Sequence, residues 1–138
     1  MANPRNARGP ARPKQEAANY STITSTGIEP KVGAALAYIL GLVTGILFLA
    51  LEKDNRYVRF HAAQSIAVSV LLILAHVAVR MVSAVLAYIP IVGGLLVLVL
   101  TLGLALGTFV LWAALMWRAY EGHEWELPVA GALARRMV

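Results

Sequence analysis

The hydrophobic residues of this chain form long runs without charge. Residues 32–51, 60–79 and 81–117 contain no Asp, Glu, Lys or Arg, which gives runs of 20, 20 and 37 residues. Apolar runs of 18 or more residues are typical of membrane-spanning helices. Pro90, Gly93 and Gly94 interrupt the longest run and end a helix there. The pattern therefore predicts three spans, at about 32–51, 58–89 and 92–118.

We accordingly predict an all-α fold, an integral membrane three-helix bundle formed by residues 31–138. Residues 1–30 have no apolar periodicity and carry Arg5, Arg8, Arg12 and Lys14, which predicts a disordered basic tail. Residues 127–138 combine Leu and Val with two terminal arginines. They are predicted to form a short C-terminal helix in the membrane interface.

Small residues recur every four positions in two of the predicted spans. This spacing lets the backbone of another helix approach closely, so it predicts tight helix packing. The alternative is that Gly and Ala are simply frequent in membrane helices. The predicted packing residues are Gly33, Ala37, Gly41, Gly45, Gly103 and Gly107.

One face of the second predicted helix is largely polar. At 100° per residue, seven polar residues fall on one side of this helix. They are His61 and Gln64 near its start, followed by Ser65, Ser69, His76, Arg80 and Ser83. Polar side chains on a membrane helix face protein or water, because an unpaired polar group in hydrocarbon is costly. Arg80 is either a functional charge or a cation that reaches the far headgroups.

Three spans would bring the loop after the first helix and the segment after the third to the same side of the membrane. We predict that these two segments form one polar cap, in which Arg59 and His61 pair with acids that follow the third helix. The alternative is a set of separately solvated charges. The polar cap comprises Glu52, Lys53, Asn55, Arg56, Arg59, His61, Gln64, Arg118, Tyr120 and Glu121.

Composition supports a membrane protein and narrows the chemistry. The chain is 59% hydrophobic and 14% charged, has a net charge of +5 and contains no Cys, whereas about 25% of an average soluble domain is charged. This excludes a soluble enzyme, a nucleic-acid-binding domain and a disulfide scaffold. Catalytic motifs are absent, and His61 and His76 lie about 22 Å apart along a helix. We predict no enzyme activity, no cofactor and no metal site.

The distribution of basic residues gives a weak signal for orientation. With three spans, six Lys and Arg lie on the polar-cap side and six on the other. Counting only about 20 residues around each span keeps six on the cap side and about three opposite, which favours a cytoplasmic cap. This orientation requires export of the basic tail. We expect the protein in a bacterial or archaeal cytoplasmic membrane.

Two segments carry a family resemblance: residues 51–65, LEKDNRYVRFHAAQS, and residues 117–136, WRAYEGHEWELPVAGALARR. They resemble the Tic-twenty-like family, small bacterial and archaeal membrane proteins related to a chloroplast inner-envelope import component. The plant relatives of that family are assigned to protein translocation and are described with four spans. This chain supports three, a departure that argues against a translocation channel. The matching positions are Glu52, Lys53, Asn55, Arg56, Val58, Arg59, Phe60, His61, Ala62, Gln64, Ser65, Ala119, Tyr120, Gly122, Leu127, Pro128 and Gly131.

Three functional hypotheses follow from these patterns. The first is a non-enzymatic accessory or interaction subunit of a membrane complex, whose partners are other membrane subunits or a second copy. The second is a small transporter or translocation component, with the polar face of the second helix lining a wet path. The third is a protein that binds membrane lipid, including anionic lipid. Neither a nucleic-acid partner nor a small-molecule substrate is predicted.

Overall fold

The computed structural model describes residues 24–138, which form five helices joined by turns and short loops. The helices are α2 (Pro30–Leu36), α3 (Leu42–Leu51), α4 (Arg56–Leu86), α5 (Val92–Glu121) and α6 (Ala130–Met137). The all-α prediction is confirmed for the described part of the chain. Most of the predicted basic tail, residues 1–23, lies outside the described residues, and residues 24–29 form a turn that leads into α2.

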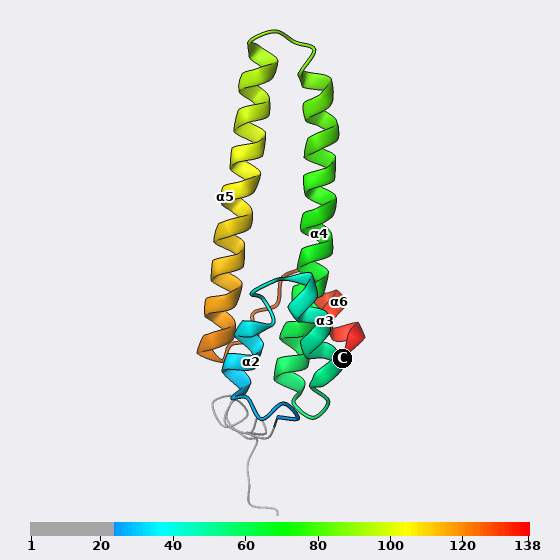
Figure 1. Ribbon diagram of the computed structural model, residues 1–138, viewed down its shortest axis with the longest axis vertical. Coiled ribbons are helices and arrows are strands. Elements are labelled where there is room, and N and C mark those ends of the chain that lie inside the picture. The colour runs from blue at the N-terminus through cyan, green and yellow to red at the C-terminus, as the bar shows by residue number, and fades with distance from the viewer. Residues whose placement is uncertain (1–23) are drawn as a thin grey trace, which may run out of the picture.

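The helices are arranged as one long hairpin with a cluster of short helices at one end (Figure 1). Helices α4 and α5 run antiparallel, and α2, α3 and α6 gather around the start of α4 and the end of α5. We call this region the packed end; it comprises residues 24–68, with α2, α3 and the start of α4, and residues 111–138, with the end of α5 and α6. The remaining residues, 69–110, form the hairpin arm, whose side chains are mostly exposed.

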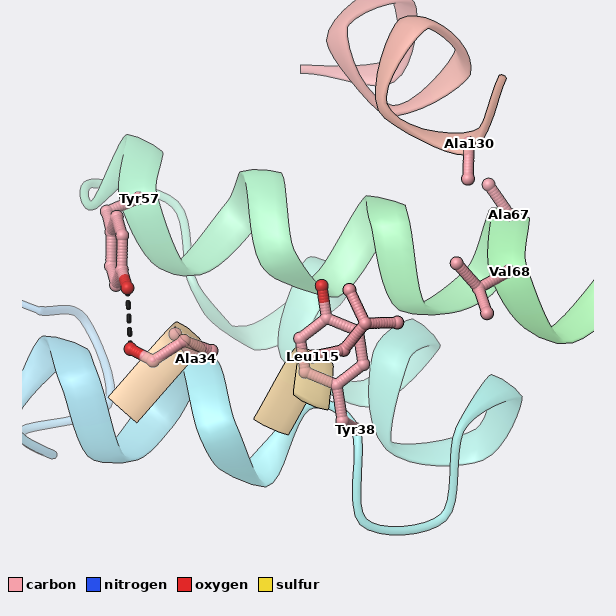
Figure 2. Close-up of a cluster of buried hydrophobic side chains, with 8 residues drawn as sticks. Ala34, Tyr38, Tyr57, Ala67, Val68, Leu115 and Ala130 are labelled. Carbon is pink, nitrogen blue, oxygen red and sulfur yellow. Dashed lines mark hydrogen bonds between the residues drawn. The ribbon is translucent and has the colours of Figure 1, made fainter. Parts of the chain in front are cut away.

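The hydrophobic core lies in the packed end. Tyr38 and Leu115 are each 2% exposed, and Ala34 and Ala119 are fully buried. Figure 2 shows Tyr38 and Leu115 meeting between the helices, with Tyr57 reaching across from α4. Small side chains dominate this core, so the helix backbones lie close together.

The three-helix prediction is wrong, because the first predicted span is broken in two. Residues 37–41 form a turn between α2 and α3, and α3 returns toward the end at which α2 began. Gly41 adopts φ +57°, a conformation that glycine reaches without steric cost. At 1.5 Å per residue, α2 and α3 are only about 10 and 15 Å long, whereas a bilayer core is about 30 Å thick. In residues 24–138, only α4 and α5 are long and apolar enough to cross it.

The turn between α4 and α5 depends on a second glycine. A Cβ added at Gly93 would overlap the backbone carbonyl oxygen of Leu86, whereas one added at Gly94 would meet nothing within 4 Å. The turn also holds Ile91 at φ 61°, a conformation that is strained for a β-branched residue. Helix α4 consequently ends at Leu86, before the predicted end at residue 89.

Candidate functional site

The polar cap is organised around the carboxylate of Glu52, which is fully buried. Its Oε1 accepts hydrogen bonds from the backbone N–H groups of Ser25 and Asn55, both at 2.9 Å, and of Asp54 at 3.2 Å. Its Oε2 accepts from the backbone N–H of Thr26 at 3.4 Å and from the Thr26 hydroxyl at 3.3 Å. Glu52 thereby fastens the segment before α2 to the loop before α4.

The surroundings of Glu52 favour its charged form. Burial acts to raise the pKa of Glu52, but the backbone N–H groups of Ser25, Asn55, Thr26 and Asp54 outweigh it, so the pKa lies below the usual value for a glutamate. The charged carboxylate is therefore a structural anchor of the packed end.

Asn55, the last residue of the same loop, and Arg59, in the first turn of α4, stabilise the start of this helix. The Asn55 side chain accepts a hydrogen bond from the Val58 N–H at 3.3 Å and caps the helix. Arg59 donates from Nη1 to the carbonyl oxygen of Glu52 at 3.1 Å. Glu52, Asn55 and Arg59 together therefore stabilise the N-terminus of α4.

The polar side chains at the start of α4 hold the end of α5 and the loop after it. The Tyr57 hydroxyl donates to the Ala119 carbonyl at 2.6 Å, the bond drawn as a dashed line in Figure 2. Gln64 donates from Nε2 to the carbonyl of Trp125 at 3.0 Å. These bonds join segments about 60 residues apart in the chain, so they fix the relative position of α4 and α5.

His61 lies at the centre of this network and is 1% exposed. Its Nδ1 shares a hydrogen bond with the Tyr38 hydroxyl at 3.1 Å, and the rings of Tyr38, Tyr57 and Phe60 surround it edge-on. The backbone carbonyl of Tyr38 accepts a hydrogen bond from Trp112 Nε1 at 2.7 Å. His61 and its neighbours thus connect α2, α4 and α5.

The ion pairs of the polar cap differ from the predicted ones. Arg59 and His61 do not pair with acids after α5, since Arg59 bonds to the Glu52 carbonyl and His61 to Tyr38. The acids after α5 instead pair with Arg118 and Arg135: Arg118 lies 3.9 Å from Glu121, and Arg135 pairs with Glu124 and Glu126. Lys53, Arg56 and Tyr120 are exposed at the same end of the molecule.

The turn between α2 and α3 has its backbone satisfied by side chains. Ser65 on α4 donates to the carbonyl oxygens of Ala37 at 2.8 Å and Gly41 at 3.0 Å. Thr44 donates to the Ala37 carbonyl at 2.9 Å. Irregular backbone at membrane depth is tolerated only where protein or water satisfies it. These contacts satisfy the backbone carbonyls of the α2–α3 turn within the protein.

The predicted polar face of the second helix is divided between the two regions. Ser65 is buried in the packed end, and Ser69 is half-buried against Gly41. His76 and Arg80 are exposed on the hairpin arm, where they line an open groove of about 830 Å³ together with Ser69. The side-chain oxygen of Ser83 is covered and lacks a hydrogen-bond partner among the described residues.

The predicted packing residues also separate into two groups. A Cβ added at Gly33 would lie 3.5 Å from the Val58 side chain, and one added at Gly45 would lie 3.0 Å from the Ala62 carbonyl oxygen. Both glycines therefore allow close contact with α4. Ala37 is fully buried. Gly103 and Gly107 on α5 meet nothing within 4 Å. Gly41 packs against Ser69, so four of the six predicted residues pack within the chain, and the α5 pair does not.

Sequence reasoning missed several residues that build this site. Ser25, Thr26, Tyr38, Thr44 and Trp112 all make the contacts described above and were not predicted to do so. A Thr and a Tyr within an apolar run were a usable signal, because buried hydroxyls on membrane helices need partners. Ser25 and Thr26 lay in a segment assigned to the tail, where nothing indicated an acceptor 26 residues further along.

Comparison with known proteins assigns the chain to a family. Residues 20–134 match the magnetosome magnetite crystal formation protein family. The chain belongs to this family. A UPF0132 membrane protein of Methanocaldococcus jannaschii is 38% identical over 82% of this chain and 92% of its own length, and one of Archaeoglobus fulgidus is 32% identical over 80% and 97%. No solved structure matches.

These matches correct the resemblance drawn from the sequence. The segments at residues 51–65 and 117–136 belong to the magnetosome and UPF0132 family, and nothing in the comparisons supports a Tic-twenty-like protein. The relatives are named membrane proteins, and this chain has two helices suited to membrane insertion. The chain is therefore a helical membrane protein of a family whose archaeal relatives carry no assigned activity in their names.

Proposed function

We propose that this chain is a non-enzymatic interaction subunit of a membrane complex, in which α5 packs against a membrane-spanning helix of another protein or of a second copy. The observation that carries the proposal is the bare surface of α5. In the most apolar 18-residue stretch of this helix, no residue is buried by the rest of the chain. Gly103 and Gly107, one turn apart on that surface, are open.

Membrane helices associate through close van der Waals contact at small residues rather than through the hydrophobic effect. A Gly-xxx-Gly pair buried against another helix gains such contacts, whereas the same pair facing lipid gains none. Within the chain, α4 does not use this surface, since nothing lies within 4 Å of either glycine. A second helix supplies the missing contact.

The family name attaches magnetite crystal formation to proteins of this type. For this chain we propose the assembly role alone, carried out in the membrane. Among residues 24–138, no group of three or more His, Asp or Glu side chains could hold a metal ion, and the proposed role needs none.

The test compares bulky substitutions on two faces of α5. Gly103→Leu with Gly107→Leu fills the open surface, whereas Ala105→Leu adds the same bulk on the opposite side of the helix, where Ala105 is also exposed. We expect the double variant to lose its cross-linked partner or dimer in native membranes and Ala105→Leu to keep it. Unchanged cross-linking in a folded double variant would contradict the proposal.

We also infer that the polar cap lies on the cytoplasmic side. Because α2 and α3 form a hairpin that returns, Lys31 lies at the polar-cap end, near Gly122. Among residues 24–138 this end carries seven basic residues against one, Arg80, on the hairpin arm: Lys31, Lys53, Arg56, Arg59, Arg118, Arg135 and Arg136. Such an excess favours the cytoplasm, and the orientation no longer requires the tail to be exported.

A water-filled path along α4 is the weaker candidate. Ser65, the first serine of the polar face, is 1% exposed, and its hydroxyl is engaged by the α2–α3 turn. The groove above it opens toward the surroundings of the hairpin arm. If cysteines introduced at Ser69 and Ser83 both react with a water-soluble thiol reagent in intact membranes, the transport role becomes the better explanation.

A further inference from the structure

The groove on α4 lies directly above the point at which the α2–α3 hairpin stops. Leu40, Gly41 and Leu42 of that hairpin form one end of the groove, and it continues past Ser69 as far as Arg80 and Ala84. From Ser69 to Arg80 the helix rises about 16 Å. This is close to half of the roughly 30 Å bilayer core, or the depth of one leaflet.

Arg80 gives this groove a cationic end. It is the only Lys, Arg, Asp or Glu between Phe60 and Trp117, and no hydrogen bond or ion pair within residues 24–138 engages it. His76 lies one turn below it and also lines the groove. Its Nδ1 donates to the Leu72 carbonyl at 2.8 Å, which leaves Nε2 unengaged.

We propose that this groove binds a phospholipid of the leaflet opposite the polar cap, with one acyl chain lying along α4 and the phosphate on Arg80. Three observations favour a lipid over a protein helix. The groove is one leaflet deep, its walls between the hairpin turn and Arg80 are apolar except for Ser69 and His76, and its outer end carries an unpaired cation. A guanidinium matches a phosphate group in geometry as well as in charge.

The broken first helix creates the site. A continuous span over residues 32–51 would cover the same face of α4 through both leaflets, but α2 and α3 cover it only through one. The lipid completes the face that the hairpin leaves bare. This proposal stands independently of the one for α5, because α5 contributes no residue to the groove.

The test measures lipid retained by the purified full chain in detergent, using native mass spectrometry with phosphatidylglycerol as the probe. Arg80→Gln removes the phosphate contact, and the matched control Arg56→Gln removes an exposed arginine at the other end of α4. Val77→Phe fills the part of the groove between the hairpin turn and Arg80, where the acyl chain is proposed to lie, without touching the packed end. Diacylglycerol, which lacks a phosphate, serves as the control lipid.

We expect Arg80→Gln and Val77→Phe each to lower phosphatidylglycerol binding about tenfold, which corresponds to about 1.4 kcal/mol, and Arg56→Gln to leave it unchanged. Diacylglycerol should bind the wild-type chain no better than it binds Arg80→Gln. Equal phosphatidylglycerol binding by wild type and Arg80→Gln would overturn the phosphate contact. Loss with Arg80→Gln but not with Val77→Phe would overturn the seating of the acyl chain. Unchanged thermal midpoints of both variants verify that they are folded.

Discussion

The hydroxyl of Ser65 on α4 donates to the carbonyl oxygen of Ala37, 28 residues earlier, at a distance of 2.8 Å. Ala37 begins the turn at which the chain reverses inside the packed end, and the same hydroxyl also lies 3.0 Å from the carbonyl of Gly41. One side chain therefore contacts both ends of the turn. The Ala37 carbonyl also accepts from the Thr44 hydroxyl and the Gly41 carbonyl from the Gly45 N–H, both at 2.9 Å, so Ser65 adds a contact from α4 to a turn that α3 already supports.

Replacing Ser65 by Ala should destabilise the protein by about 1 kcal/mol, because the buried hydroxyl shared by the Ala37 and Gly41 carbonyls is lost while their bonds from Thr44 and Gly45 remain. The measurement is the thermal unfolding midpoint in detergent. Ser83→Ala is the matched control, since the Ser83 hydroxyl is covered and has no partner in the described part of the chain. We expect Ser83→Ala to leave the midpoint unchanged or to raise it slightly. Equal effects of the two substitutions would show that the Ser65 contact contributes nothing.

Stability should fall in acid through Glu52. The pKa of Glu52 is lower in the folded state than the value of about 4.3 in the unfolded chain. The stabilisation is therefore fully present above pH 4.3 and is lost as the pH falls through the folded value.

Glu52→Gln should be less stable at neutral pH by about 2 kcal/mol, because the charged acceptor of five hydrogen bonds is gone, and its midpoint should change less than that of the wild type between neutral pH and pH 3. Thermal midpoints measured across this range test the prediction. Glu29→Gln replaces an exposed acid that makes no side-chain cap contact and should follow the wild-type profile. A parallel acid loss in Glu52→Gln would assign the pH dependence to other groups.

The α4–α5 turn should tolerate alanine at one glycine and not at its neighbour. Gly93→Ala places a Cβ against the Leu86 carbonyl oxygen and should cost about 3 kcal/mol, whereas Gly94→Ala meets open space and should be neutral or stabilising. Unfolding midpoints of the two variants give the comparison. Comparable midpoints would mean that the turn adjusts without penalty.

Membrane topology offers a direct test of the broken first helix. The chain has no cysteine, so single cysteines can be introduced at Ser25, Lys53 and Tyr88 without background. A membrane-impermeant maleimide should label the first two from the same side and Tyr88→Cys from the other. Three spans would instead separate Ser25→Cys from Lys53→Cys.

The sequence was sufficient to predict the long helices because their signal is local. Continuous apolar runs specify α4 and α5, and Pro90 with Gly93 marks the turn between them. The start of α4 was also recognisable as a polar motif near residues 52–65, although its bonds were assigned to the wrong partners. Arg59 was expected to pair with an acid after the third predicted helix, but it bonds to the Glu52 carbonyl in the loop just before α4.

The break in the first apolar run could not be read from local pattern. Residues 32–51 satisfy the criteria for a span, and Gly41 is as compatible with a helix as Gly33 or Gly45. What decides its conformation is Ser65, whose hydroxyl lies beside the turn only after α4 has packed there. Hydropathy records how much apolar surface a segment offers, and it does not record which side chain from elsewhere satisfies its backbone.

The five residues from Ala87 to Ile91 that connect α4 and α5 contain no charge. With the α2–α3 hairpin returning to the side on which it began, this connection is the only described segment between helices that must pass through the bilayer. Insertion during biosynthesis therefore does not require a charged loop between helices to cross the bilayer. The described residues can enter the membrane from one face as two hairpins of unequal depth, and Arg80 is the only charged side chain among residues 24–138 that this insertion carries through the bilayer core.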